Sequence, residues 1–417
     1  MKRFVLTLTV VCFIIQSFKA GEKELAFVKD NFSYADVQLK SMLNKTEKTA
    51  GFPRTTKTGK LVTTNMYDWT PGFFPGSLWY AYEYTKDTAL KTAAVKWTER
   101  LEPLKDFTQH HDLGFMMYCS YGNAYRLTGN IQYKDILVQA ARSLSTRYDS
   151  ITGCIKSWNE FKSWHGDKTY SFPVIIDNMM NLELLFFASK ASGDASFRKI
   201  AVSHALHTMK NQVRKDYSSY HVVCYDTVTG KVVGRETAQG YSDNSTWARG
   251  QAWGIYGFTM AYRETKDKRF LKTAQGMGDF FINHKSLPAD KIPYWDFNIG
   301  EVGYIPGLKS NAKPSSPKYR DASAAAVTAS ALLELSSYPG RHSRNYKAVA
   351  VQMLHSLAGP DYRANLGTNG NFLLMQSVGS LPHSSEINVP LVYADYYFLE
   401  AMKRYNMMLE GKQLFGE

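Results

Sequence analysis

Apolar residues recur along most of the chain at the three- and four-residue spacing of amphipathic helices, and short polar turns interrupt them. The turns share a pattern, in which an apolar run with Tyr or Phe precedes a polar step and a second helical run. The clearest copies lie at Asp87, Asn130, Asp194 and Asp267, and a weaker one spans 335–340. Because Gly, Asn and Asp tolerate the left-handed conformation that ends a helix, each turn is expected to join two helices.

Five such turns, together with a final helix near Val392–Tyr405, indicate six helical hairpins. Repeated hairpins form a solenoid or a closed ring, and six of them favour an all-α fold, the (α/α)6 barrel. The more apolar helix of each pair should line the centre. If these inner helices run parallel, their starts share one rim, and the loops that enter them form the site. The expected starts lie near Pro71, Asp112, Asp177, Trp247, Asp321 and Pro390.

The N-terminal segment is typical of an export signal. Lys2 and Arg3 precede an apolar run from Phe4 to Ile15, and the small Ala20 offers a cleavage point. This run is too short to span a membrane, and no later stretch of eighteen uncharged apolar residues follows. We therefore expect a signal peptide at residues 1–20, a periplasmic protein without a membrane segment, and a single domain at residues 21–417, since no Pro-, Gly- or Ser-rich linker divides it.

Composition and charge narrow the class of partner. The chain has 417 residues, 44% of them hydrophobic, which is enough for a large core. Its net charge of +13 becomes +10 once Lys2, Arg3 and Lys19 are removed, and this excess fits an anionic substrate. The basic residues form no long run, so nucleic acid is not expected as a partner.

The cysteine pattern indicates neither a disulfide framework nor a metal site. Three cysteines follow the signal segment, Cys119, Cys154 and Cys224, and they have no short pairing or C-x-x-C spacing. We expect buried free thiols, no metal and no cofactor.

Two segments carry the candidate chemistry. Asp112 lies in HHDLGF (residues 110–115) and Asp177 in FPVIIDN (172–178), each where a loop becomes an apolar helical run. If the two helix starts share a cavity, paired carboxylates provide acid/base chemistry on sugars. Alternatively, each Asp is a helix N-cap. The apolar residues before Asp177 and a nearby carboxylate would raise its pKa, whereas a helix dipole would lower it, so the sequence leaves the net direction open.

Several aromatic and polar residues are candidates for sugar contact. Arg249 could hold a carboxylate bidentately or form a salt bridge within the scaffold. Of Trp247 and Trp253, six residues apart, one could stack on a sugar and one is expected in the core. Trp69 precedes an inner helix, and Trp158 and Trp164 lie in the long loop before Asp177. His221 falls in a strand-like excursion between helices, where a structural role competes with a functional one.

Together these segments resemble the unsaturated glucuronyl hydrolases of glycoside hydrolase family 88. The resemblance covers nearly the whole mature chain and rests on HHDLGF (110–115), IKSW (155–158), FPVIIDNMMNLELL (172–185), WARGQAWGIYGF (247–258) and VPLVYADYYFLEAM (389–402). It implies an (α/α)6 barrel, in agreement with the hairpin count. It also implies removal of a terminal uronic acid that a polysaccharide lyase has left with a C4=C5 double bond.

The resemblance implies roles for individual residues. Asp177 matches the general acid and base, and Asp112 the second essential aspartate. In the implied mechanism, Asp177 protonates C4 and then activates water for attack at C5, after which the hemiketal opens and releases the next sugar. The implied substrate contacts are Trp69, Trp158 (with Trp164 competing), His221, Gln239, Arg249, Trp253 and, near the next sugar or its sulfate, Ser384 and Ser385.

Alternatives stay open at this point. One is an unsaturated rhamnogalacturonyl hydrolase acting on pectin fragments. Another is a sugar epimerase, which would need paired histidines, and a third is a noncatalytic binder of anionic oligosaccharides. The sequence does not decide between chondroitin-, hyaluronan- and heparin-derived substrates, and we expect a monomer or weak dimer. Four basic residues could contact sulfate or belong to a solvated loop: Lys309, Lys313, Lys318 and Arg320.

Overall fold

A computed structural model describes residues 2–47, 49–166, 168–312 and 317–415, and for residues 2–20 it describes the backbone alone. Lys313 lies outside the described residues. The helices are α1 (Lys2–Thr46), α2 (Phe73–Thr85), α3 (Thr88–Glu99), η1 (Glu102–Asp106), the π-helix η2 (Gly114–Gly122), α4 (Asn123–Thr128), α5 (Ile131–Ser145), η3 (Ile176–Asn181), α6 (Leu182–Ser192), α7 (Ala195–Asn211), α8 (Ala248–Thr265), α9 (Lys268–Asn283), α10 (Ala322–Leu335), α11 (Ser343–Leu357), η4 (Asn369–Asn371) and α12 (Val392–Leu409). The strands are β1 (Phe52–Lys57), β2 (Lys60–Thr64), β3 (Tyr148–Asp149), β4 (Cys154–Ile155), β5 (Phe161–Lys162), β6 (Thr169–Tyr170), β7 (Pro173–Ile175), β8 (Val222–Tyr225), β9 (Val232–Glu236), β10 (Ser377–Ser380) and β11 (Ser385–Val389).

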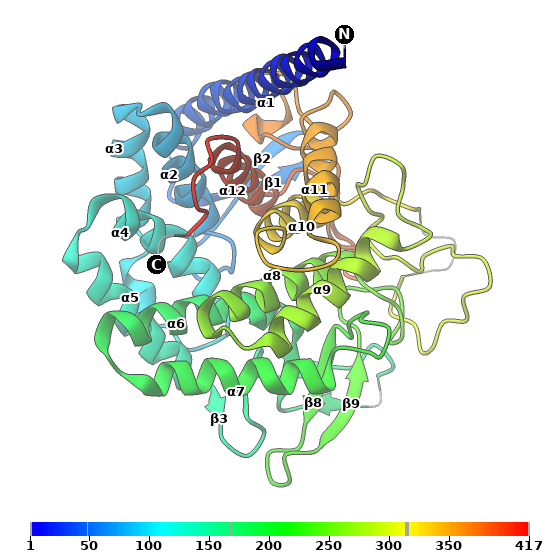
Figure 1. The fold of residues 1–417 in the computed structure, drawn as a ribbon. Helices are drawn as coiled ribbons and strands as arrows, with labels where there is room; N and C mark the ends of the chain where they lie inside the picture. Colours follow the sequence, from blue (N-terminus) through cyan, green and yellow to red (C-terminus); the bar gives the residue numbers. More distant parts are fainter. Residues whose placement is uncertain (1, 48, 167, 313–316, 416–417) are drawn as a thin grey trace.

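The helices form two concentric layers. The inner elements contact one another in the closed order α2, η2, η3 with α6, α8, α10, α12 and back to α2. Around them lie α1, α3, α5, α7, α9 and α11 (Figure 1). Every residue of the inner helix α10 is buried, most of them apolar. The predicted all-α (α/α)6 barrel is therefore confirmed, with α1 packed against α12 as the sixth outer helix.

The hairpin turns use two adjacent residues, which differs in part from the prediction. Each Asp or Asn of the turns is extended and N-caps the second helix, as Asp87 does by accepting a hydrogen bond from the Ala89 N–H. The preceding residue takes the left-handed conformation, and it is Gly at 129 and 193 but Lys at 86 and 266. Side-chain capping explains the difference, because a carboxylate or amide oxygen can satisfy a free helix N–H only from the extended backbone.

All six inner elements begin within a few residues of the predicted positions, and the segments leading into them carry the small sheets. The largest sheet joins β7, β8 and β9, with β8 central and both pairings antiparallel. The predicted strand-like excursion at His221 is confirmed, since β8 begins at the next residue. Cys119, Cys154 and Cys224 are buried free thiols, as expected.

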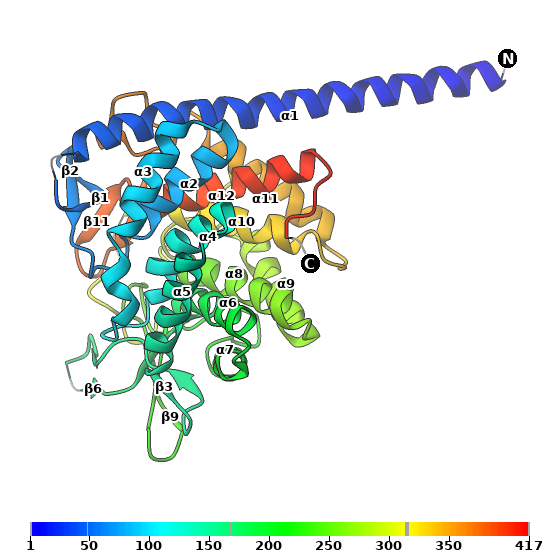
Figure 2. The same ribbon diagram turned by 90° about the vertical axis from the view of Figure 1, so that its left-hand side faces the viewer.

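Helix α1 extends well beyond the barrel at its N-terminal end (Figure 2). Its later part packs on the barrel through buried side chains such as Val28, Phe32 and Leu39. No helix among the described residues combines the length and the hydropathy needed to cross a bilayer. The signal peptide at 1–20 and the domain boundary at residue 21 stay predictions.

Candidate active site

A cavity of about 720 Å³ opens where the inner helices begin. Its wall comes from distant segments: Trp69 precedes α2, Gln239 precedes α8, and Tyr393 lies in the first turn of α12. The loop 158–166 and the β10–β11 hairpin complete it. Of the predicted substrate contacts, the lining includes Trp69, Trp158, Trp164, Gln239, Arg249 and Ser385. The helix ring thus brings together residues more than 300 positions apart.

Asp177, in η3, is not among the residues that line this cavity, but it lies close enough to the wall residue Arg249 to feel its charge. Its side chain is buried, with 9% of the residue exposed, and Oδ2 has no hydrogen-bond partner among the described residues. Burial raises the pKa of Asp177 to about 7; the charge of Arg249 opposes this shift, and the charge of Asp112 reinforces it. The pKa that the sequence left open is therefore raised, and the carboxyl exists in both protonation states near neutral pH.

Asp112 is equally buried but sits between two imidazoles. His110 Nδ1 lies 3.2 Å from Oδ2, and His111 Nε2 lies 3.3 Å from Oδ1. Burial alone would raise the pKa of Asp112, yet these histidines and Arg147 outweigh it and hold the pKa below its usual range. The pKa values of the two aspartates are therefore separated, so that Asp112 is ionised while Asp177 can donate a proton. Such a separation is how paired carboxylates acquire different roles.

His221 faces Asp177 as a neutral donor. Its Nδ1 accepts hydrogen bonds from the Ala238 and Gln239 backbone N–H groups, each at 3.1 Å, so its proton is assigned to Nε2. Burial lowers the pKa of His221 to about 3. Nε2 lies 3.8 Å from Asp177 Oδ2, too far for a hydrogen bond, and neither atom has another partner among the described residues. The two groups can therefore share a bridging water or a substrate atom.

Arg249 belongs to the scaffold as well as to the cavity wall. Its guanidinium donates to Asp321 Oδ2 at 3.0 Å, to the Gly379 carbonyl at 2.6 Å and to the Val378 carbonyl. Asp321 in turn N-caps α10. The salt bridge that the sequence offered as an alternative is therefore present. Arg249 provides a fixed positive charge near Asp177, and direct contact with a substrate stays a prediction.

Trp253 lies in the core of the barrel, and its predicted contact with the substrate stays a prediction. It is fully buried between Phe115 and Tyr397, and it does not line the cavity. Its indole N–H instead lies close enough to Asp177 to lower the pKa of that carboxyl, against the larger effect of burial. Trp247 is also buried, with its ring 4.5 Å from that of His221. Both tryptophans occupy inner positions because α8 is surrounded by other inner helices.

The structure bears on three further possibilities that the sequence raised. Ser384 is exposed in the β10–β11 turn and does not line the cavity, unlike Ser385. Neither Asp112 nor Asp177 caps a helix through its side chain, because both carboxylates turn toward the site. In the basic loop, Lys318 donates to the Gly300 carbonyl and Arg320 to Asp290, and neither lines the cavity.

Sequence reasoning missed part of the wall. Arg54 donates to Glu386 at 2.6 Å and also pairs with Asp68, which joins β1, the loop before α2 and β11 at the cavity edge. No local motif marks this contact, since Arg54 and Glu386 lie far apart in sequence. Tyr393 could have been found, because it belongs to the segment 389–402 that the sequence singles out.

The model of glycosyl hydrolase family 88 matches residues 44–275. The unsaturated glucuronyl hydrolase of Formosa agariphila is 42% identical over 93% of this chain and 92% of its own length. A crystal structure of an unsaturated glucuronyl hydrolase specific for heparin superimposes with a TM-score of 0.84, at 44% identity, over 94% of this chain and 100% of that one. The structure of a variant unsaturated glucuronyl hydrolase from Streptococcus agalactiae, complexed with dGlcA-GalNAc6S, superimposes with a TM-score of 0.73 at 31% identity over 92% of each chain.

Proposed function

This chain belongs to glycosyl hydrolase family 88, and from its site we propose how it removes an unsaturated glucuronic acid. It is a glycosidase that releases the 4,5-unsaturated uronic acid from the non-reducing end of glycosaminoglycan oligosaccharides made by lyases. The observation that carries the mechanism is the unpartnered, buried Asp177 with a pKa of about 7, beside an ionised Asp112.

The reaction begins with proton transfer from Asp177 to C4 of the enol ether. Positive charge then develops at C5 and the ring oxygen. Asp112, which stays ionised, stabilises this charge electrostatically. Arg249 stays bound to Asp321 and supplies a fixed charge that lets Asp177 ionise without a change in the scaffold.

Water then adds at C5 with Asp177 as base. An oxygen that lies to one side of the 3.8 Å pair formed by Asp177 Oδ2 and His221 Nε2 can donate to the first and accept from the second. A group that donates and then recovers a proton works best with a pKa near the operating pH, which burial provides for Asp177. The hemiketal opens, and the remaining sugar leaves.

The substrate is bound by aromatic and polar wall residues. Trp69 and Trp158 offer stacking faces on the cavity wall, and Gln239 is held by its hydrogen bond to the Gly379 carbonyl at 3.0 Å. The relatives reported above are glucuronyl hydrolases, which favours this reaction over the rhamnogalacturonyl one and over noncatalytic binding.

Asp177→Asn is the test of the mechanism. The variant should lose about 10³- to 10⁴-fold of the activity, followed as disappearance of the C4=C5 ultraviolet absorbance, because an amide can neither donate nor recover the proton. Substrate should still bind, and the circular dichroism spectrum should be unchanged. Activity within about tenfold of the parent would remove Asp177 from this role.

Heparin-derived unsaturated disaccharides are the proposed preferred substrates. Support comes from the heparin-specific hydrolase, which is more similar to this chain than is the Streptococcus agalactiae variant bound to dGlcA-GalNAc6S. A panel of defined heparin, chondroitin and hyaluronan disaccharides should give the highest kcat/KM for the heparin members. A tenfold preference for chondroitin or hyaluronan would contradict this assignment.

Export to the periplasm is also proposed, with support from the basic start, the apolar run to Ile15 and the small Ala20. The expected monomer or weak dimer stays a prediction. Mass spectrometry of the protein from osmotically released periplasm should give a chain beginning at Gly21. An intact N-terminus in the cytoplasmic fraction would contradict it.

A further inference from the structure

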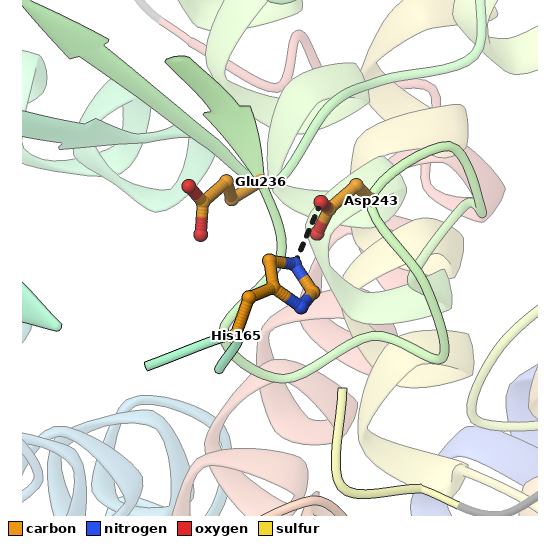
Figure 3. A group of neighbouring side chains, drawn as sticks. All are labelled: His165, Glu236 and Asp243. Atoms are coloured by element: carbon orange, nitrogen blue, oxygen red, sulfur yellow. Dashed lines mark hydrogen bonds and ion pairs between the residues drawn. The ribbon is translucent and has the colours of Figure 1, made fainter. Parts of the chain in front are cut away.

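Behind the cavity wall, three side chains form a group that the mechanism does not use. His165, Glu236 and Asp243 each offer one ligand atom, and these atoms all lie within 4.8 Å of one another. They come from the β5–β6 loop, the end of β9 and the loop that follows β9, and Figure 3 shows His165 and Asp243 facing one another with Glu236 beside them. None of the three lines the active-site cavity.

The donor set suits a divalent transition metal. His165 Nε2 and Asp243 Oδ2 are 3.1 Å apart. Two ligands about 2.0–2.1 Å from a tetrahedral Zn²⁺ ion are about 3.3 Å apart, so this pair already has the required separation. One imidazole with two carboxylates favours Zn²⁺ over Ca²⁺ or Mg²⁺, which prefer oxygen donors alone.

Glu236 gives an independent sign of a missing ligand. The residue is only 7% exposed, and its Oε1 accepts a hydrogen bond from the Tyr170 hydroxyl at 2.6 Å. Its Oε2 is buried and has no hydrogen-bond partner among the described residues. A bare buried carboxylate oxygen is costly, and a cation shared with His165 and Asp243 would remove that cost.

The carboxylates are held in place from outside the group. The Thr237 backbone N–H donates to Asp243 Oδ1 at 3.0 Å, and this leaves Oδ2 directed at His165. The Tyr170 hydroxyl orients Glu236 in the same way. Such outer hydrogen bonds orient metal-binding carboxylates and strengthen their affinity.

We propose that His165, Glu236 and Asp243 bind one Zn²⁺ ion that fastens two parts of the cavity wall together. The β5–β6 loop contributes Ser163 and Trp164 to the wall, and the segment after β9 contributes Ala238 and Gln239. Apart from the ligand group, the two segments meet through the Trp164 indole N–H, which donates to the Ala238 carbonyl at 3.1 Å. A bound ion holds the wall in the shape that receives the substrate.

The test uses the full chain without a histidine tag, stripped with EDTA and dialysed. Titration with Zn²⁺ alone should show one tight site by calorimetry, and metal analysis after dialysis should give one Zn²⁺ per chain. The melting temperature should rise with Zn²⁺, because an ion that binds only the folded state stabilises it by mass action. Substitution by Co²⁺ should give the visible absorption of a low-symmetry site.

Variants decide whether these residues are the ligands. His165→Ala and Glu236→Gln should each weaken Zn²⁺ binding at least about 10-fold and abolish the rise in melting temperature. His342→Ala is the matched control, because it removes another His–Asp pair, with Asp279 at 2.8 Å, and should bind as the parent does.

Three outcomes would overturn the proposal. They are an absence of stoichiometric binding in the parent, unchanged affinity in both ligand variants, and an equal loss of affinity in His342→Ala. If a ligand variant fails to fold, the Co²⁺ spectrum of the other decides, since a lost ligand must change it.

Discussion

Buried carboxylates occur at both ends of the barrel, and the two groups are arranged differently. At the end of the barrel opposite the active site, called the far end below, Arg263 donates to Glu334 at 2.9 and 3.0 Å and also to Glu183. Arg404 lies 3.3 Å from Glu334 and 3.5 Å from Glu400. At the active end, Asp177 Oδ2 has no partner among the described residues, although Arg249 is close and bonded to Asp321.

A raised pKa does not separate the two ends. Burial raises the pKa of Glu183 to about 7, as it does for Asp177, and a second cavity adjoins Glu183. The difference lies in the partners, because Glu183 is bonded to an arginine while Asp177 leaves one oxygen for a substrate. The comparison shows that a raised pKa alone does not distinguish Asp177 from Glu183, and that the free oxygen of Asp177 does.

The largest expected effect is on stability at the far end. Arg263→Ala leaves Glu183 and Glu334 buried without their main counter-charge, and it should lower the free energy of unfolding by about 3–5 kcal/mol in urea titrations. Arg269→Ala is the control, since its side chain is 60% exposed where it pairs with Asp267, and it should leave the free energy of unfolding almost unchanged. The folded Arg263 variant should keep its kcat. A loss of kcat without a loss of stability would contradict the assignment of a purely structural role to the carboxylates of the far end.

Asp177→Asn should stabilise the protein at alkaline pH. Because the folded pKa of about 7 exceeds the value of about 3.9 in an unfolded chain, the contribution of the protonated carboxyl is complete below about pH 4 and is lost as the pH rises through 7. The asparagine variant should therefore gain about 2–4 kcal/mol at pH 8 and little at pH 4. Urea unfolding at the two pH values measures this, and equal gains at both would contradict the assigned pKa.

The hairpin repeat and the apolar runs were enough to predict the barrel and its six inner helix starts. Side-chain direction was harder to predict, as Trp253 and Ser384 show, because neither periodicity nor motif reveals which face of an inner helix or turn meets a cavity. The pKa of Asp177 depends on burial and on charges that act in opposite directions, and only the folded geometry shows that burial prevails. His165 lies 71 positions before Glu236 and 78 before Asp243, so no local spacing pattern could reveal the group.

Asp112→Asn should shift the pH dependence of activity. Removing a negative charge beside Asp177 should lower the pKa of Asp177, so activity should decline at a lower pH on the alkaline side. The profile of kcat/KM against pH reports the shift in the free enzyme. An unchanged alkaline limb would mean that Asp112 acts on the substrate and not on Asp177.

The smallest expected effect is on substrate binding, and it distinguishes a tryptophan on the cavity wall from one in the barrel core. Trp69→Ala should raise KM about tenfold with little change in kcat, because Trp69 lines the cavity and provides a face for stacking. Steady-state kinetics with a defined unsaturated disaccharide measures it. An unchanged KM would place the sugar on another aromatic residue.

Direct titration of Asp177 tests the central claim. Carbon-13 NMR of the aspartate carboxyl carbons, with Asp177→Asn to assign the signal, gives the pKa in the free protein. We expect about 7, against an ordinary value of about 3.9. A pKa near 4 would show that the carboxyl is ionised at neutral pH and would contradict its role as proton donor.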